Sequence, residues 1–159
     1  MNIGYETASL SRADRAILRV LQRDAGATVE ALAEAAGLSP ASAWRRAKAL
    51  EAAGVVTARV ALADPAKLDR ALCVFADVTL REHAPERRAA FERFVAGAEE
   101  VMECHATSGG RDYLLKIRVS DVAAYEAFLM EALLAHPAVA SASSSFSLRE
   151  LKYATALPV

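Results

Sequence analysis

Aromatic residues are scarce in this chain, and long apolar runs are missing from it. Aromatics make up 6% of the 159 residues, too few for a single-stranded nucleic-acid binder that stacks bases on aromatic platforms. No apolar run reaches the length of a membrane span, and the opening MNIGYETASL lacks the basic start and apolar core of a signal peptide. These absences predict a cytoplasmic protein with no membrane partner.

Cysteine and histidine are also few. Cys73 and Cys104 both lie in apolar, strand-like stretches, which argues against a disulfide framework. His83, His105 and His136 are scattered, and neither cysteine has a second metal ligand at a useful spacing, so we expect no metal site. His105 follows Cys104 directly, but neighbours along a strand point to opposite faces and cannot form a nucleophilic dyad. No phosphate loop or dinucleotide fingerprint is present, so we expect neither an enzyme nor a cofactor.

Two helical patterns joined by a short turn occupy residues 28–56. Thr28 is placed to cap the first helix, and Gly37 suits the left-handed conformation that ends such a helix. Ser39 and Pro40 have the residue types of a second helix start. Two helices at this spacing, with an arginine pair in the second, predict a helix-turn-helix that places side chains in a DNA major groove.

Positive charge is concentrated in the second helix and the residues after it, although the formal net charge of the whole chain is −1. Residues 39–59 contain a single anion, Glu51, and four cations: Arg45, Arg46, Lys48 and Arg59. A local excess of cations is what contact with DNA phosphates requires. An ordinary solvated helix face would carry the same charges, because helix-turn-helix geometry also occurs in domains that bind no DNA.

The face of the second helix opposite its apolar stripe supplies the candidate DNA contacts. We predict that Ser42, Arg45 and Arg46 contact DNA and that Ser39 binds a phosphate at the helix N-terminus. Arginine binds guanine bidentately or binds phosphate alone, and the sequence leaves both open. Trp44 lies beside the apolar stripe, so packing against the first helix or a second subunit is favoured over base contact.

The pattern changes at Leu72. Residues 1–63 are predicted to form the DNA-binding domain, 64–71 the linker, and 72–159 a second domain in which strands and helices alternate as β-α-β-β-α-β. The fold class is therefore α+β, a winged helix-turn-helix followed by a ferredoxin-like domain. The uncovered sheet face of such a domain predicts dimerisation. The expected elements are a strand or wing at 55–62, strands at 72–80, 101–107, 113–119 and 139–148, and helices that begin at Pro85 and after Asp121.

A glycine-containing turn separates the two middle strands of this domain. Gly109 and Gly110 expose backbone N–H groups that suit a carboxylate, and Asp112 can pair with the ammonium of a free amino acid. The same residues would also serve as a plain β-hairpin turn. The last strand carries serines that either line a site or form a solvated face: Ser141, Ser143, Ser144 and Ser145.

Four stretches, in order and at the right spacing, resemble the Lrp/AsnC family of bacterial and archaeal feast/famine transcription regulators. Residues 10–24 resemble the family's opening, with Ser11 where an aspartate is usual, and residues 37–56 resemble its recognition helix. Residues 108–115, SGGRDYLL, resemble its effector loop, which usually reads T-G-x-x-D-Y. The ending LKYATALPV is close to the family's terminus, so the resemblance covers nearly the whole chain.

The resemblance implies a homodimer, possible tetramers or octamers, two-fold-related half-sites on double-stranded DNA, and a small effector, usually an amino acid, held between subunits. Arg111 departs from the family, in which an aromatic is common, and either admits an acidic or polar effector or disables the pocket. Two other functions stay open: a ligand-free architectural DNA protein, and a small enzyme that lacks a convincing acid–base pair. The expected effector site comprises Ser108, Gly109, Gly110, Arg111, Asp112, Tyr113, Ser143 and Ser145.

Overall fold

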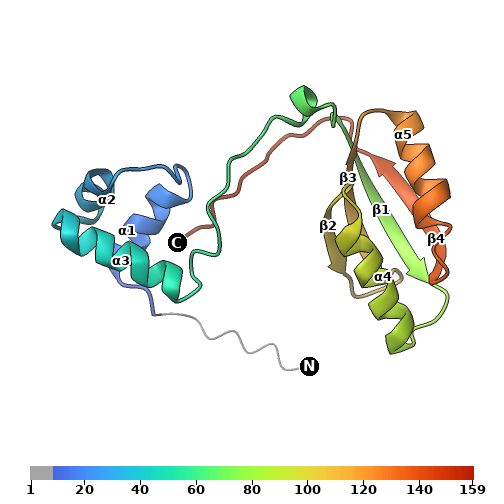
Figure 1. The fold of residues 1–159 in the computed structure, drawn as a ribbon, viewed down its shortest axis with the longest axis horizontal. Coiled ribbons are helices and arrows are strands. Elements are labelled where there is room, and N and C mark those ends of the chain that lie inside the picture. The colour runs from blue at the N-terminus through green and yellow to red at the C-terminus, as the bar shows by residue number, and fades with distance from the viewer. Residues whose placement is uncertain (1–8) are drawn as a thin grey trace. The chain divides into compact units, whose positions relative to one another are not determined.

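The structure is a computed structural model that describes residues 9–159 as parts of two compact units. The helical unit contains the described residues up to Leu62 together with Lys152–Val159, and the β unit contains Ala63–Leu151 (Figure 1). We name Lys152–Val159 the return segment, because it rejoins the helical unit after the β unit. The sequence pattern groups these residues with the C-terminal domain, whereas in the structure they pack with the helical unit.

The helical unit is built from α1 (Arg12–Leu21), α2 (Val29–Ala36) and α3 (Pro40–Ala52). Each helix turns its apolar stripe to a shared core, and Ile17 of α1 and Ala43 of α3 are fully buried there. Small alanines on α3 allow the helices to approach closely. The remaining buried members of this core are Leu18, Leu21, Leu32, Ala33, Ala47 and Leu50.

Side-chain caps fix where these helices begin, as the sequence predicted. Ser11 accepts a hydrogen bond from the Asp14 N–H, and the Asp14 carboxylate accepts one from the Ser11 N–H, which makes a reciprocal capping box. Thr28 and Ser39 cap α2 and α3 through their hydroxyls alone, which accept hydrogen bonds from the N–H groups of Ala31 and Ser42. Gly37 ends α2 at φ +66°, a conformation that costs a residue with a Cβ about 1–2 kcal/mol.

The predicted strand at residues 55–62 does not form in this structure. The backbone N–H groups of Val55 and Val56 both donate to the Leu50 carbonyl, which closes the end of α3 and removes two donors from any ladder. A strand also needs a neighbouring strand to accept its remaining backbone bonds. Residues 57–62 instead run extended without a partner strand.

The return segment is held against the helical unit through α1. The side-chain amide of Gln22, the residue that ends α1, donates to the Leu157 carbonyl at 3.1 Å and accepts from the Leu157 N–H at 2.6 Å. Val159 packs against the apolar core of the unit. The Gln22 side chain thus satisfies both the N–H and the carbonyl of Leu157, as a neighbouring backbone would in a sheet.

The β unit has the predicted β-α-β-β-α-β order. Its strands are β1 (Leu72–Leu80), β2 (Val101–Ala106), β3 (Tyr113–Val119) and β4 (Val139–Phe146). They form one antiparallel sheet in the order β2-β3-β1-β4, as a ferredoxin-like domain requires. The helical elements are η1 (Pro65–Leu68), α4 (Pro85–Gly97), α5 (Val122–Ala127) and a π-helical turn η2 (Phe128–Leu133) that continues α5.

The sheet has one covered and one open face because residues alternate along each strand. Val74, Ala76 and Val78 of β1 are fully buried against α4 and α5, with Phe91 at the centre of that core. The intervening positions of β1 face the other way, where no helix covers them (Figure 1). Among residues 9–159, none of the helices is long and apolar enough to cross a membrane.

Replacing Asp14 with alanine should destabilise the helical unit by about 1–2 kcal/mol, because it removes the capping box and the partner of Arg46. Urea unfolding followed by the fluorescence of Trp44, the only tryptophan of the chain, measures the difference. The Ser11 hydrogen bond and Arg46 lower the pKa of Asp14. The stabilisation is therefore complete above the ordinary aspartate pKa of about 3.9 and is lost as pH falls through the lowered value. Equal stability of the two proteins at pH 7 would contradict this role.

Replacing Gln22 with alanine should release Leu157, because each lost hydrogen bond contributes about 0.5–1.5 kcal/mol. Hydrogen exchange at the Leu157 amide should become faster, while exchange in the β unit stays unchanged. Arg19→Ala, an exposed change on the same helix, is the matched control and should leave the exchange rate as it is. Identical exchange in both variants would mean that Gln22 does not hold the segment.

Candidate functional site

The outward face of α3 is the candidate DNA interface. Trp44, Arg45 and Lys48 are exposed on it, opposite the buried stripe that contains Ala47. The Trp44 side chain is 54% exposed, so packing against α1 does not account for it. This face combines a cation and an aromatic ring at the position where a helix-turn-helix meets a groove.

Ser39 and Ser42 lie together at the N-terminus of α3. The Ser39 hydroxyl accepts a hydrogen bond from the Ser42 N–H at 3.4 Å and donates to the Ser42 hydroxyl at 3.1 Å. The positive end of the helix dipole lies at this point. Two hydroxyls at the positive end of a helix dipole can bind a phosphate oxygen.

Arg46 is turned toward α1, which differs from the outward orientation that the sequence predicted. Its Nη1 donates to Asp14 Oδ1 at 2.9 Å and to the Ser11 hydroxyl at 3.2 Å. The Asp14 side chain is 15% exposed, so the ion pair is partly shielded from solvent. Helical periodicity places Arg46 between the core and the solvent, and its long side chain reaches the α1 cap. The structure therefore brings Arg46 into the joint between α3 and α1.

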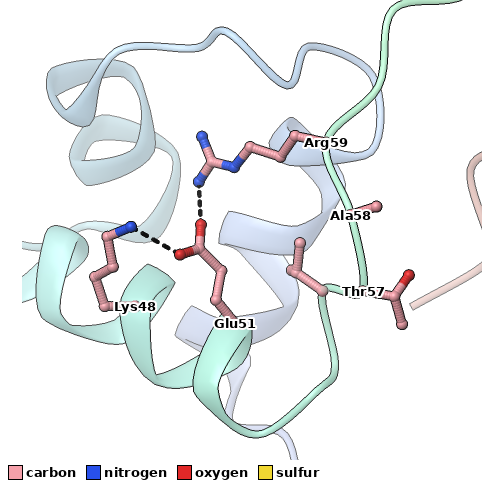
Figure 2. Close-up of a pocket in the computed structure, with 6 residues that line it drawn as sticks. Lys48, Glu51, Thr57, Ala58 and Arg59 are labelled. Carbon is pink, nitrogen blue, oxygen red and sulfur yellow. Dashed lines mark hydrogen bonds and ion pairs between the residues drawn. The ribbon is translucent and has the colours of Figure 1, made fainter.

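Lys48 and Arg59 are held by one carboxylate, that of Glu51 (Figure 2). Lys48 Nζ lies 2.8 Å from Glu51 Oε2, and Arg59 Nη2 lies 2.6 Å from Oε1. Arg59 Nη1 also donates to the Ala25 carbonyl at 3.1 Å. Hydrogen bonds from Lys48, then from Arg59, lower the pKa of Glu51. Within residues 9–159, Arg45 is the one cation of the 39–59 stretch for which the structure records no ion pair.

The candidate ligand loop connects β2 to β3. The Thr107 N–H donates to the Asp112 carbonyl at 2.9 Å, and the Thr107 hydroxyl donates to the Arg111 carbonyl at 3.0 Å. These bonds close a turn that contains Ser108, Gly109 and Gly110. Gly109 has φ +121°, which strains any residue with a Cβ, although the space beside it is open. The turn therefore requires glycine for its backbone conformation.

Asp112 is tied to the end of β1. Its Oδ2 accepts the Leu80 N–H at 2.7 Å, and its Oδ1 lies 3.3 Å from His83 Nδ1. Its own N–H donates to the Val78 carbonyl. The carboxylate predicted to meet an effector's ammonium thus already positions the loop against the neighbouring strand.

Asp77 was missed as a site residue by the sequence analysis. It lies on the open face of β1, with its carboxylate oxygen 2.5 Å from Arg111 Nη1. The Asp77 side chain is 15% exposed and that of Arg111 is 61% exposed. The sequence feature that points to Asp77 is that it is the single charged residue in Leu72–Leu80. A carboxylate in a strand of apolar neighbours needs a partner, and the loop supplies it.

The predicted serines and Tyr113 divide between the two faces of the sheet. Ser143 pairs across the ladder with Asp77, so it shares the open face with the ligand loop. Ser145 lies on that face too, two residues further along β4. Tyr113 instead belongs to the covered core, where its hydroxyl donates to Glu92 at 2.9 Å. Burial, with Glu92 as a second cause, raises the pKa of Tyr113 to about 12.

Comparisons with known proteins bear on both units. A family model described as winged helix-turn-helix DNA-binding matches residues 10–57, and one described as Lrp/AsnC ligand binding domain matches residues 73–157. The leucine-responsive regulatory protein of Escherichia coli K12 is 39% identical over 94% of this chain and 92% of its own. DecR, a DNA-binding transcriptional activator of the same organism, is 33% identical over 94% of this chain and 99% of its own.

A solved structure agrees in fold. The transcriptional regulator NMB0573 from Neisseria meningitidis, in a complex with L-Met, superposes with a TM-score of 0.91 at 39% identity, over 94% of this chain and 97% of that one. Both halves of the molecule and their order along the chain are shared with these regulators. The chain therefore belongs to the Lrp/AsnC family and is a DNA-binding transcriptional regulator of that type.

Proposed function

We propose that this regulator binds two-fold-related sites on double-stranded DNA as a homodimer, or as a tetramer or octamer, and that a small amino-acid effector changes its binding. The observation that carries the DNA contact is the outward face of α3, where Arg45 is exposed and no carboxylate is recorded beside it within residues 9–159. Ser39 and Ser42 at the start of α3 provide the adjacent phosphate contact.

Arg45 and Arg46 are assigned different roles at this interface. Arg45 is free to reach a base edge or a phosphate, as the outward position of a recognition helix allows. One guanidinium nitrogen of Arg46 is paired with Asp14, so a DNA contact would use the remaining N–H donors of the guanidinium group. The ion pair with α1 fixes the direction in which the Arg46 side chain points. Arg46 therefore contributes both to the interface and to its orientation.

The effector site is proposed at the ligand loop and the open sheet face next to it. A free amino acid carries one carboxylate and one ammonium group. Arg111 and the backbone N–H groups of Gly109 and Gly110 suit the first, and Asp77 suits the second. Support comes from the ligand-binding family model over this domain and from the relative solved with L-Met. Ser108, Asp112, Tyr113, Ser143 and Ser145 frame or support this loop.

The open face also supplies the proposed dimer contact. Phe75 is exposed at its centre, and Lys116 and Arg118 on β3 flank it with side chains only 16% and 17% exposed. The methylene chains of Lys116 and Arg118 lie along the sheet and leave a mostly smooth open face. A second copy that covers this face would place two ligand loops near one interface, so that an effector can act on assembly.

Arg45→Ala should weaken DNA binding by about 1–3 kcal/mol, with little change in stability. Arg46→Ala should weaken DNA binding and also lower the melting temperature, because it leaves Asp14 without its partner. Fluorescence anisotropy on a duplex selected from a random library by the unaltered protein measures the affinity. Arg93→Ala, an exposed change on α4, is the control. Full-strength binding by Arg45→Ala would overturn the assignment of α3.

A thermal-shift screen against the twenty amino acids and common 2-oxo acids should give a single class of hit. A ligand at 100 times its dissociation constant stabilises the fold by about 2.7 kcal/mol. Asp77→Asn and Arg111→Met should both abolish the shift, whereas Arg93→Met should keep it. A shift that survives both site changes would place the effector elsewhere. No hit with intact DNA binding would favour a ligand-free architectural protein, with Arg111 engaged by Asp77 in place of a ligand.

A further inference from the structure

A depression of about 510 Å³ lies between α3 and the segment that follows it. Two cations, Lys48 and Arg59, border it, and the Glu51 carboxylate lies between them (Figure 2). The hydroxyl-bearing Thr57 also lines it. A concave site bordered by two cations has the composition of an anion site, yet an internal anion, the Glu51 carboxylate, occupies its centre.

The depression adjoins the face of α3 that is assigned to DNA. Lys48 follows Arg45 by three residues, which places both on one side of the helix. The exposed fraction of the side chain is 56% for Lys48 and 42% for Arg59, so both can reach an outside ligand. Arg59 is anchored by the Ala25 carbonyl through Nη1, so Nη2 stays at the depression whichever anion it meets.

We propose that Lys48 and Arg59 form a binding site for one backbone phosphate of double-stranded DNA, and that the Glu51 carboxylate occupies this site in the free protein. This inference rests on the proposed function of α3. Each oxygen of Glu51 meets one cation, at 2.8 and 2.6 Å. Two phosphate oxygens can make the same two contacts, because both groups present paired anionic oxygens.

This replacement of the Glu51 carboxylate by a DNA phosphate makes Glu51 a determinant of specificity. Its charge cancels one of the two cations and repels an approaching phosphate, so non-specific duplex gains little from the site. A duplex held in register by base contacts on α3 brings its phosphate close enough to displace the carboxylate. A glutamate carboxylate is already ionised at neutral pH, and hydrogen bonds from Lys48 and Arg59 lower the pKa of Glu51 further.

Glu51→Gln tests the proposal with a mixed-sequence duplex of about 30 base pairs as the probe. Affinity measured by anisotropy between 50 and 200 mM salt gives the slope of log K against log salt. Each further phosphate contact steepens that slope by about 0.9, an additional loss of about 3.5-fold over this range. We expect the Glu51→Gln change to raise affinity at 50 mM and to steepen the slope by about one such contact.

Two matched variants separate this exchange from general charge and from folding. Glu34→Gln, an exposed change on α2 in the same unit, alters the net charge equally and should leave the slope at the wild-type value. Adding Lys48→Gln to the Glu51→Gln protein should cancel the gain. An unchanged slope in Glu51→Gln, or an equal change in Glu34→Gln, overturns the proposal. Absence of any duplex binding by the unaltered protein overturns the proposed function itself.

A purely structural role of Glu51 gives the opposite result. If its ion pairs only hold the segment of Arg59 against α3, then Glu51→Gln loosens that segment and lowers affinity without steepening the salt dependence. The melting temperature of each variant shows whether folding has changed. A lower affinity with an unchanged slope would therefore count against phosphate exchange.

Discussion

The ion pair between Arg46 and Asp14 is the interaction on which the geometry of the helical unit depends. Asp14 closes the capping box with Ser11 and accepts Arg46 at the same time, so a single carboxylate fixes the start of α1 and the direction of α3. The Asp14 side chain is partly shielded from solvent while that of Arg46 is 41% exposed, so the ion pair itself contributes about 0–1 kcal/mol. This joint ties α3 to α1, and α3 carries the proposed DNA contacts of Ser39, Ser42 and Arg45.

A common electrostatic pattern runs through both units. Carboxylates of the chain itself hold Arg46, Arg111 and the pair Lys48 and Arg59. A cation that is already paired with a carboxylate of the same chain can bind an outside anion only if that anion displaces the carboxylate. The internal ion pair is then lost, which favours ligands that make further contacts. Positive charge counted along the sequence therefore overstates the charge that DNA or an effector meets. Internal ion pairs of this kind favour selectivity over raw affinity in any site that they occupy.

Local signals in the sequence predicted most of the fold. Caps such as Ser39 and the alternation of β1 act within a few residues, so the helix starts and the limits of β1 and β3 followed directly. The strands β2 and β4 end at Ala106 and Phe146, before the predicted ends at residues 107 and 148. The direction of Arg46, the partner of Asp77 and the attachment of Leu157 to Gln22 depend on residues far along the chain. The spacing of apolar residues along the chain carries no information about contacts between such distant residues. The strand predicted at residues 55–62 is absent for the same reason, since a strand exists only when another backbone accepts its bonds.

The attachment of the return segment has a consequence for synthesis. A ribosome delivers the chain from its N-terminus, and domains generally fold as they emerge. The helices of the first unit are complete long before Leu157 and Val159 exist, while the whole β unit is translated in between. The β unit can therefore fold before the helical unit gains the hydrogen bonds between Gln22 and Leu157.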